Sequence, residues 1–172
     1  TDNITSSMLF ADGSAAALLT HSGQADMPGL EIENFYSEII PRGKRDMAWE
    51  LSSSGFQMTL SGYIPDLIEE DFEQLVARAL LSSNVSKSDI TDWCIHPGGK
   101  RVLEAVCKSM GIEGAQLSYS YDILKHYGNM SSPTILFVLK ELMKAISQRT
   151  GRKIFGAAFG PGLTMETFVL KS

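Results

Sequence analysis

The feature that most constrains the fold of this chain is a long amphipathic segment near its middle. Pro65 suits the first turn of a helix, and the acidic run 69–71 lies near the positive end of the helix dipole. We therefore predict a helix that begins near Ile64 and ends at 82–84. Its apolar residues recur at the three- and four-residue spacing of one helix face: Ile64, Leu67, Ile68, Phe72, Leu75, Val76, Ala79 and Leu80.

Patterns typical of strands precede this helix. Alternation over 30–40 predicts one strand, and short apolar runs at 47–51 and 56–60 predict two more around a serine-glycine turn. Apolar and small residues over 8–20, grouped around Gly13, predict a strand, a glycine turn and a second buried stretch.

Helices dominate the chain after the amphipathic segment, and two strands close it. An apolar run at 93–95 predicts a buried strand. Strands first, helices next and a final strand pair imply a single α/β domain over 1–172, with a mixed β-sheet covered by helices. The remaining predicted elements are helices at about 102–110, 121–126 and 132–149, and strands at 153–159 and 163–170.

The composition fits an ordinary globular protein. The chain has 172 residues, enough for one domain with a sizeable core, and 44% of them are hydrophobic. Its net charge of −5 argues against nucleic acid as a partner, because phosphate binding needs a basic surface. No run approaches the ~18 apolar residues of a membrane span. We therefore expect neither nucleic acid nor a membrane as a partner.

The cysteines and the N-terminus indicate a cytoplasmic protein. Cys94 and Cys107 form no Cys-x-x-Cys pair and lie in apolar surroundings, so we expect neither a disulfide framework nor a metal site. The N-terminus, Thr1-Asp2-Asn3, carries no signal peptide. It also lacks an initiator methionine, which suggests a fragment of a longer protein.

His96 is the first candidate for chemistry. It follows the predicted buried strand and precedes Pro97-Gly98-Gly99 and a helix. Ligands gather at the carboxyl ends of strands in α/β sheets, and a helix N-terminus disfavours the charged imidazole. A neutral imidazole can donate one N–H to a developing oxyanion. The alternative is a core histidine beside a turn, with its hydrogen bonds satisfied.

Asn129 is the second candidate, within Gly-Asn-Met-Ser-Ser-Pro at 128–133. Its amide offers two donors and cannot lose a proton, which suits stabilisation of an oxyanion. The alternative is structural, because Gly-Asn is a common turn and Pro133 suits a first helical turn.

Other chemistry-bearing residues give weaker signals. The turn 160–162, Gly-Pro-Gly, joins two predicted strands and is typical of a hairpin. It is a poor phosphate cradle, because no helix follows it. Cys94 shares a strand face with His96, but its apolar neighbours favour a buried thiol with a raised pKa. Cys107 falls on the apolar stripe of its helix, so neither cysteine is expected to act as a nucleophile.

Together these segments resemble the type III polyketide synthases of the chalcone and stilbene synthase family, in order and spacing. The resemblance covers nearly the whole chain. It rests on Trp-Cys-Ile-His-Pro-Gly-Gly at 93–99, Gly-Asn-Met-Ser-Ser at 128–132, Phe-Gly-Pro-Gly-Leu-Thr-Met-Glu-Thr at 159–167, and Leu-Phe-Ala-Asp-Gly-Ser-Ala-Ala-Ala at 9–17.

The resemblance implies a thiolase-type fold of two similar halves, of which this chain is the C-terminal half. The family uses a Cys-His-Asn triad. His96 and Asn129 match the histidine and asparagine, whereas the cysteine belongs to the first half. The implied reaction joins malonyl-CoA to a starter acyl-CoA without a further cofactor. The histidine stabilises the cysteine thiolate, and both donors hold the thioester oxygen while decarboxylation leaves an enolate.

The resemblance also implies pocket residues and partners. Met58 aligns with a gating phenylalanine of plant members, Ser131 with a pocket-shaping serine, and Phe159, Gly160, Pro161 and Gly162 with a loop that lines the cyclisation cavity. Met58 itself departs from the plant pattern, as does Ala158 where glycine is usual. The expected partners are the N-terminal half, acyl-CoA substrates and, for the full-length protein, a second copy in a homodimer.

Two other readings stay open at this point. A ketoacyl synthase III-like condensing domain also uses histidine and asparagine, but its usual His-Gln-Ala-Asn and Gly-Asn-Thr-Ser signatures are missing from this sequence. A non-catalytic thiolase-fold module for binding or dimerisation would explain the lack of a nucleophile. A buried cysteine at a strand-to-helix turn upstream of Thr1 would favour an enzyme.

Overall fold

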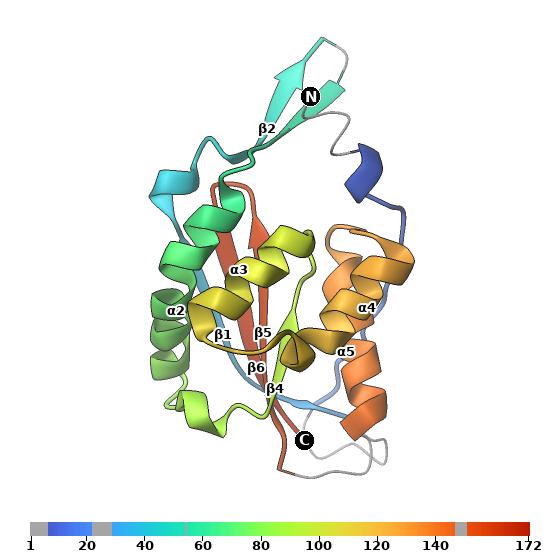
Figure 1. Cartoon of the computed structure of the whole chain (residues 1–172). Helices are drawn as coiled ribbons and strands as arrows, with labels where there is room; N and C mark the ends of the chain where they lie inside the picture. The colour runs from blue at the N-terminus through green and yellow to red at the C-terminus, as the bar shows by residue number, and fades with distance from the viewer. Residues whose placement is uncertain (1–6, 22–28, 54, 147–150) are drawn as a thin grey trace.

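The computed structural model describes residues 7–21, 29–53, 55–146 and 151–172 (Figure 1). No helix in this part of the chain is long and apolar enough to cross a membrane. The main elements, in chain order, are β1 Glu31–Ile39, β2 Met47–Ser52, β3 Gly55–Leu60, α2 Ile64–Ser82, β4 Asp92–Ile95, α3 Lys100–Met110, α4 Ser118–Tyr127, α5 Pro133–Ile146, β5 Lys153–Gly160 and β6 Thr164–Lys171.

The main sheet has the strand order β1-β6-β5-β4. β4 pairs with β5 in parallel, whereas β6 pairs antiparallel with both β5 and β1. The mixed sheet expected from the sequence is therefore confirmed. A parallel pair needs a long crossover, and α3, α4 and α5 supply it between β4 and β5 (Figure 1).

Helices cover both faces of β4. Trp93 and Ile95 lie in the hydrophobic cluster that includes residues of α2 and α3, whereas Cys94 lies in a second cluster with residues of α4 and α5. Successive side chains of a strand point to opposite faces. α2 and α3 therefore cover one face of β4, and α5 covers the other. The sequence predicted both the helices and the buried strand correctly.

The amphipathic stripe of α2 forms the centre of the larger cluster. Phe72 is fully buried and contacts the ring of Phe159 on β5, with ring centroids 5.5 Å apart. α3 packs beside α2 and ends at Gly111, whose φ of 63° is the left-handed conformation that glycine adopts readily. The apolar spacing that predicted these helices therefore corresponds to their buried faces.

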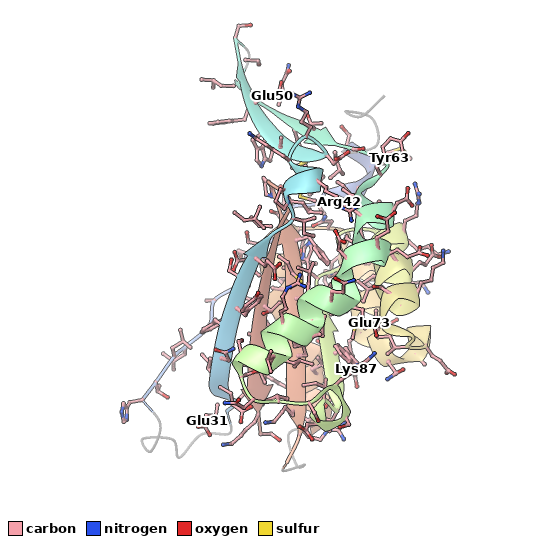
Figure 2. All side chains as sticks on the ribbon, turned by 90° about the vertical axis from the view of Figure 1, so that its left-hand side faces the viewer. Glu31, Arg42, Glu50, Tyr63, Glu73 and Lys87 are labelled. Atoms are coloured by element: carbon pink, nitrogen blue, oxygen red, sulfur yellow. The ribbon has the colours of Figure 1, made fainter. Side chains whose placement is uncertain are left out.

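β2 and β3 form a separate two-stranded sheet, which projects beyond one end of the main sheet (Figures 1 and 2). Leu51 and Phe56 near its tip are 81% and 75% exposed. A two-stranded hairpin alone is only marginally stable in water and needs packing against another element. The described residues do not supply that packing at the tip. Its register pairs apolar residues on one face: Met47 with Leu60, Trp49 with Met58, and Leu51 with Phe56.

The prediction for 8–20 was wrong. Only a short helical turn at 7–9 and a single bridge at Phe10 occur there, and the rest is irregular. Met8 and Leu18 are 85% and 83% exposed rather than buried. A strand needs a partner for its backbone groups, and no strand in the described part of the chain pairs with 11–20. The predicted end of the last long helix, 147–149, lies outside the described residues.

We expect Phe72→Ala to lower the free energy of unfolding by about 3–5 kcal/mol, because it leaves a cavity beneath α2. Phe35→Ala is the matched control, since Phe35 is 67% exposed on β1. The control should cost less than about 1 kcal/mol. Urea unfolding of both variants measures the difference, and equal losses would contradict the packing described here.

Candidate active site

His96 directly follows β4, where a backbone hydrogen bond holds it in line with the sheet. Its amide donates to the carbonyl of Ala157 on β5 at 2.8 Å, which extends the parallel ladder by one residue. The chain then turns, because the amide of Gly98 donates back to the His96 carbonyl at 2.9 Å. Pro97 cannot donate to a ladder, so the strand ends here and α3 begins at Lys100.

The side chain of His96 is buried and neutral. It is 8% exposed, and burial lowers its pKa to about 4. The neutral state expected from the sequence thus has burial as its cause. Within the described part of the chain, neither ring nitrogen has a hydrogen-bond partner. A neutral imidazole carries one N–H, so His96 has a donor available for a ligand.

Asn129 lies in the connection between α4 and α5. Backbone hydrogen bonds join this connection to the N-terminal segment at residues 9–11. The amide of Ala11 donates to the Asn129 carbonyl at 2.8 Å, and the amide of Asn129 donates to the Leu9 carbonyl at 3.0 Å. Gly128 precedes it with φ of 72°, and a side chain there would lie 3.2 Å from Cβ of Ala11. A glycine therefore permits the close approach of these two segments.

Two hydrogen bonds fix the side-chain amide of Asn129. Nδ2 donates to the Gly98 carbonyl at 3.1 Å, and Oδ1 accepts from the amide of Ser131 at 2.8 Å. Asn129 is buried, and an amide nitrogen carries two hydrogens. The second N–H has no acceptor among the described residues, so Asn129 also has one donor available.

Gly98 links the two candidates. Its carbonyl accepts from Asn129, and a Cβ built on it would lie 3.7 Å from Cδ2 and 3.9 Å from Nε2 of the His96 ring. The structure therefore brings both residues against the same glycine, although they lie far apart in the sequence. Apart from the family motifs, nothing in the sequence indicated that His96 and Asn129 both contact Gly98.

The pocket residues predicted from the resemblance lie in different places. Ser131 is exposed and adjoins Asn129, with φ of 61°. The turn 160–162 contacts the base of the hairpin, because the Gly162 amide donates to the Met47 carbonyl at 3.0 Å. Met58 is half-buried on β3, and the ring of Phe159 packs on Phe72. No hydrogen bond between described residues joins the turn or Met58 to His96 or Asn129.

Both cysteines have raised pKa values, as expected for poor nucleophiles. Cys94 is fully buried, its Sγ lies 3.8 Å from the Ile135 carbonyl, and burial raises its pKa. Burial also raises the pKa of the half-buried Cys107. A nucleophilic cysteine needs a lowered pKa and access to substrate, so neither thiol suits that role.

The chain matches the family model for chalcone and stilbene synthases, C-terminal domain, over residues 31–172. It is also similar to the Bacillus subtilis (strain 168) protein named "Putative chalcone synthase". The two are 34% identical over 170 residues, which cover 95% of this chain and 46% of that protein. The chain therefore spans about half the length of this curated relative.

Solved type III polyketide synthases have the same fold. The C-terminal type III domain of Steely1 from Dictyostelium matches 83% of this chain and 40% of its own, at 32% identity and a TM-score of 0.72. PKS-I from the brown alga Ectocarpus siliculosus matches 89% of this chain and 42% of its own, at 24% identity and a TM-score of 0.80. These likenesses confirm the predicted half of a thiolase-type α/β fold. The chain belongs to the chalcone and stilbene synthase family of type III polyketide synthases, whose C-terminal domain it matches.

Proposed function

We propose that this domain supplies two of the three catalytic groups for decarboxylative condensation of malonyl-CoA onto a starter acyl-CoA. One observation carries the proposal: His96 and Asn129 are both buried, both lie against Gly98, and each keeps one N–H without a partner among the described residues. Buried polar groups are normally paired, so unpaired donors favour a ligand oxygen at this place.

The proposed step balances as follows. Both N–H groups donate to the thioester oxygen of malonyl-CoA, and the bond to its carboxylate breaks. CO₂ leaves, and the electron pair stays as an enolate whose oxygen the two donors stabilise. The enolate carbon attacks the acyl group held as a thioester on a cysteine of the N-terminal half. A carbon–carbon bond forms, the cysteine thiolate leaves, and the product is the acyl chain extended by two carbons on CoA.

A neutral His96 suits this role. With its pKa near 4, the ring at neutral pH carries one N–H, which it can donate, and lacks the second, acidic proton of an imidazolium that the enolate could take. Burial also lowers the local dielectric, which strengthens each donor's hydrogen bond to a developing negative charge. The proposed chemistry uses acyl-CoA and malonyl-CoA as substrates and needs no further cofactor.

The substrate pocket is proposed to include the hairpin and the turn beside it. Met58 faces Trp49 on the apolar side of the hairpin, and the amide of Gly162 donates to Met47 at its base. Together with Ser131 beside Asn129, these groups would line the path of the growing acyl chain. Met58 is a flexible residue, which suits a gate less rigid than phenylalanine.

The N-terminal half of the same protein is the proposed partner. This domain exposes several large apolar side chains. They include Phe35 and Ile39 on β1, and Leu51 and Phe56 on the hairpin. Such surface usually marks an interface. The relative from Bacillus subtilis is about twice as long as the matched region, which leaves room for a second half of similar size. For the assembled protein we propose a cytoplasmic homodimer.

The test combines this chain with its N-terminal half and measures CO₂ release and polyketide formation from malonyl-CoA and a starter acyl-CoA. We expect no condensation by the chain alone, because neither of its cysteines can hold the acyl group. In the assembled protein, His96→Ala or Asn129→Ala should lower CO₂ release at least about 100-fold. Product formed by the chain alone and lost in Cys94→Ala would contradict the proposal. Activity that survives both site variants would favour a binding module.

A second prediction concerns the space beside the His96 ring. Gly98→Ala adds a methyl group at ordinary contact distance from the His96 ring, 3.7 to 3.9 Å, so the fold should tolerate it. The methyl would lie beside the His96 ring and narrow the space proposed for the thioester oxygen, so CO₂ release should fall at least about 10-fold. Gly62→Ala is the control, because its methyl meets nothing within 4 Å. Equal activity in the two variants would rule out this position of the oxygen.

A further inference from the structure

A buried threonine lies behind Asn129. Thr134 is the second residue of α5 and is fully buried. Its Oγ1 accepts from the amide of Met130 at 2.8 Å and donates to the carbonyl of Ser131 at 2.8 Å. The hydroxyl therefore binds the backbone at both ends of the Met130–Ser131 segment that follows Asn129.

The loop held by Thr134 has an unfavourable conformation. Ser131 has φ of 61°, a left-handed conformation that residues with a side chain rarely adopt. Such a conformation persists only where its surroundings impose it. In this conformation the amide of Ser131 donates to Oδ1 of Asn129 at 2.8 Å.

That contact decides which way the Asn129 amide faces. With Oδ1 on the Ser131 amide, Nδ2 lies on the Gly98 carbonyl, and its second N–H stays available. A flipped amide would place Oδ1 against the Gly98 carbonyl, which are two acceptors, and would lose both hydrogen bonds. The orientation of the catalytic donor therefore depends on the position of Ser131, which Thr134 holds.

We propose that Thr134 is a positioning residue for Asn129, acting through Met130 and Ser131. This inference rests on the proposed function of Asn129 as a donor to the thioester oxygen. Thr134 itself has no role in contact with substrate, since it is fully buried and its hydroxyl proton is donated to the loop. Removal of the Thr134 hydroxyl should weaken stabilisation of the transition state more than it weakens the binding of substrate.

The experiment compares Thr134→Val with Thr134→Ser and with the matched control Thr167→Val. Thr167 is also a buried threonine, and its Oγ1 donates to a backbone carbonyl, that of Tyr36, at 2.9 Å. Valine keeps the shape of threonine and removes the hydroxyl in both cases. The readouts are kcat and KM for CO₂ release from malonyl-CoA by the assembled protein, and the NMR signals of the Asn129 side-chain NH₂ group.

We expect Thr134→Val to lower kcat by about 10- to 100-fold with little change in KM, because the donor is displaced rather than lost. It should also shift or broaden the Asn129 NH₂ signals. Thr134→Ser should restore both readouts, and Thr167→Val should leave both unchanged. If Thr134→Val fails to fold, Thr134→Ala removes the same hydroxyl without bulk and is held to the same outcome.

Three results would overturn the inference, and the last is distinguishable from the first two. If Asn129→Ala abolishes CO₂ release but Thr134→Val behaves like Thr167→Val, Thr134 has only a structural role. The same conclusion follows if Thr134→Ser does not restore kcat. If Asn129→Ala itself leaves CO₂ release unchanged, the proposed function fails and the positioning role fails with it.

Discussion

The site depends on the parallel pairing of β4 with β5, continued by the hydrogen bond from His96 to Ala157. This pairing places His96 at the carboxyl end of a buried strand and forces the chain to turn at once. The turn leaves the carbonyl of Gly98 open to a hydrogen bond from the side chain of Asn129. Asn129 reaches it from the connection between α4 and α5. Because the hydrogen bonds that fix Asn129 all use backbone groups of its partners, the site is held by the fold rather than by mobile side chains.

Burial gives this arrangement its chemical character. The same packing that completes the core removes water from His96 and lowers its pKa, so that the ring stays neutral. It also raises the pKa of Cys94 and keeps that thiol inert. One environment therefore favours a hydrogen-bond donor and disfavours a nucleophile, as the proposed division of the catalytic groups between two halves of a protein requires.

The sequence predicted most elements, because the spacing of apolar residues reflects which face of an element is buried. Glycines marked where some of the helices end. α2 and α3 follow from apolar spacing, and β4 from its short apolar run. The segment 8–20 was mispredicted because its apolar residues have no strand to pair with in the described chain. His96 and Asn129 were candidates from their local sequence, and the family motifs assigned them to one site. Their common contact with Gly98, and the hydroxyl of Thr134 behind Asn129, depend on tertiary contacts that spacing does not encode.

The central claim is that His96 and Asn129 bind one oxygen. The most direct measurement is a crystal structure of this domain assembled with its N-terminal half and an unreactive malonyl-CoA analogue. We predict that the thioester oxygen lies roughly 3 Å from a ring nitrogen of His96 and from Nδ2 of Asn129, beside Gly98. A thioester oxygen that contacts only one of them, or side chains that point to different spaces, would contradict the account.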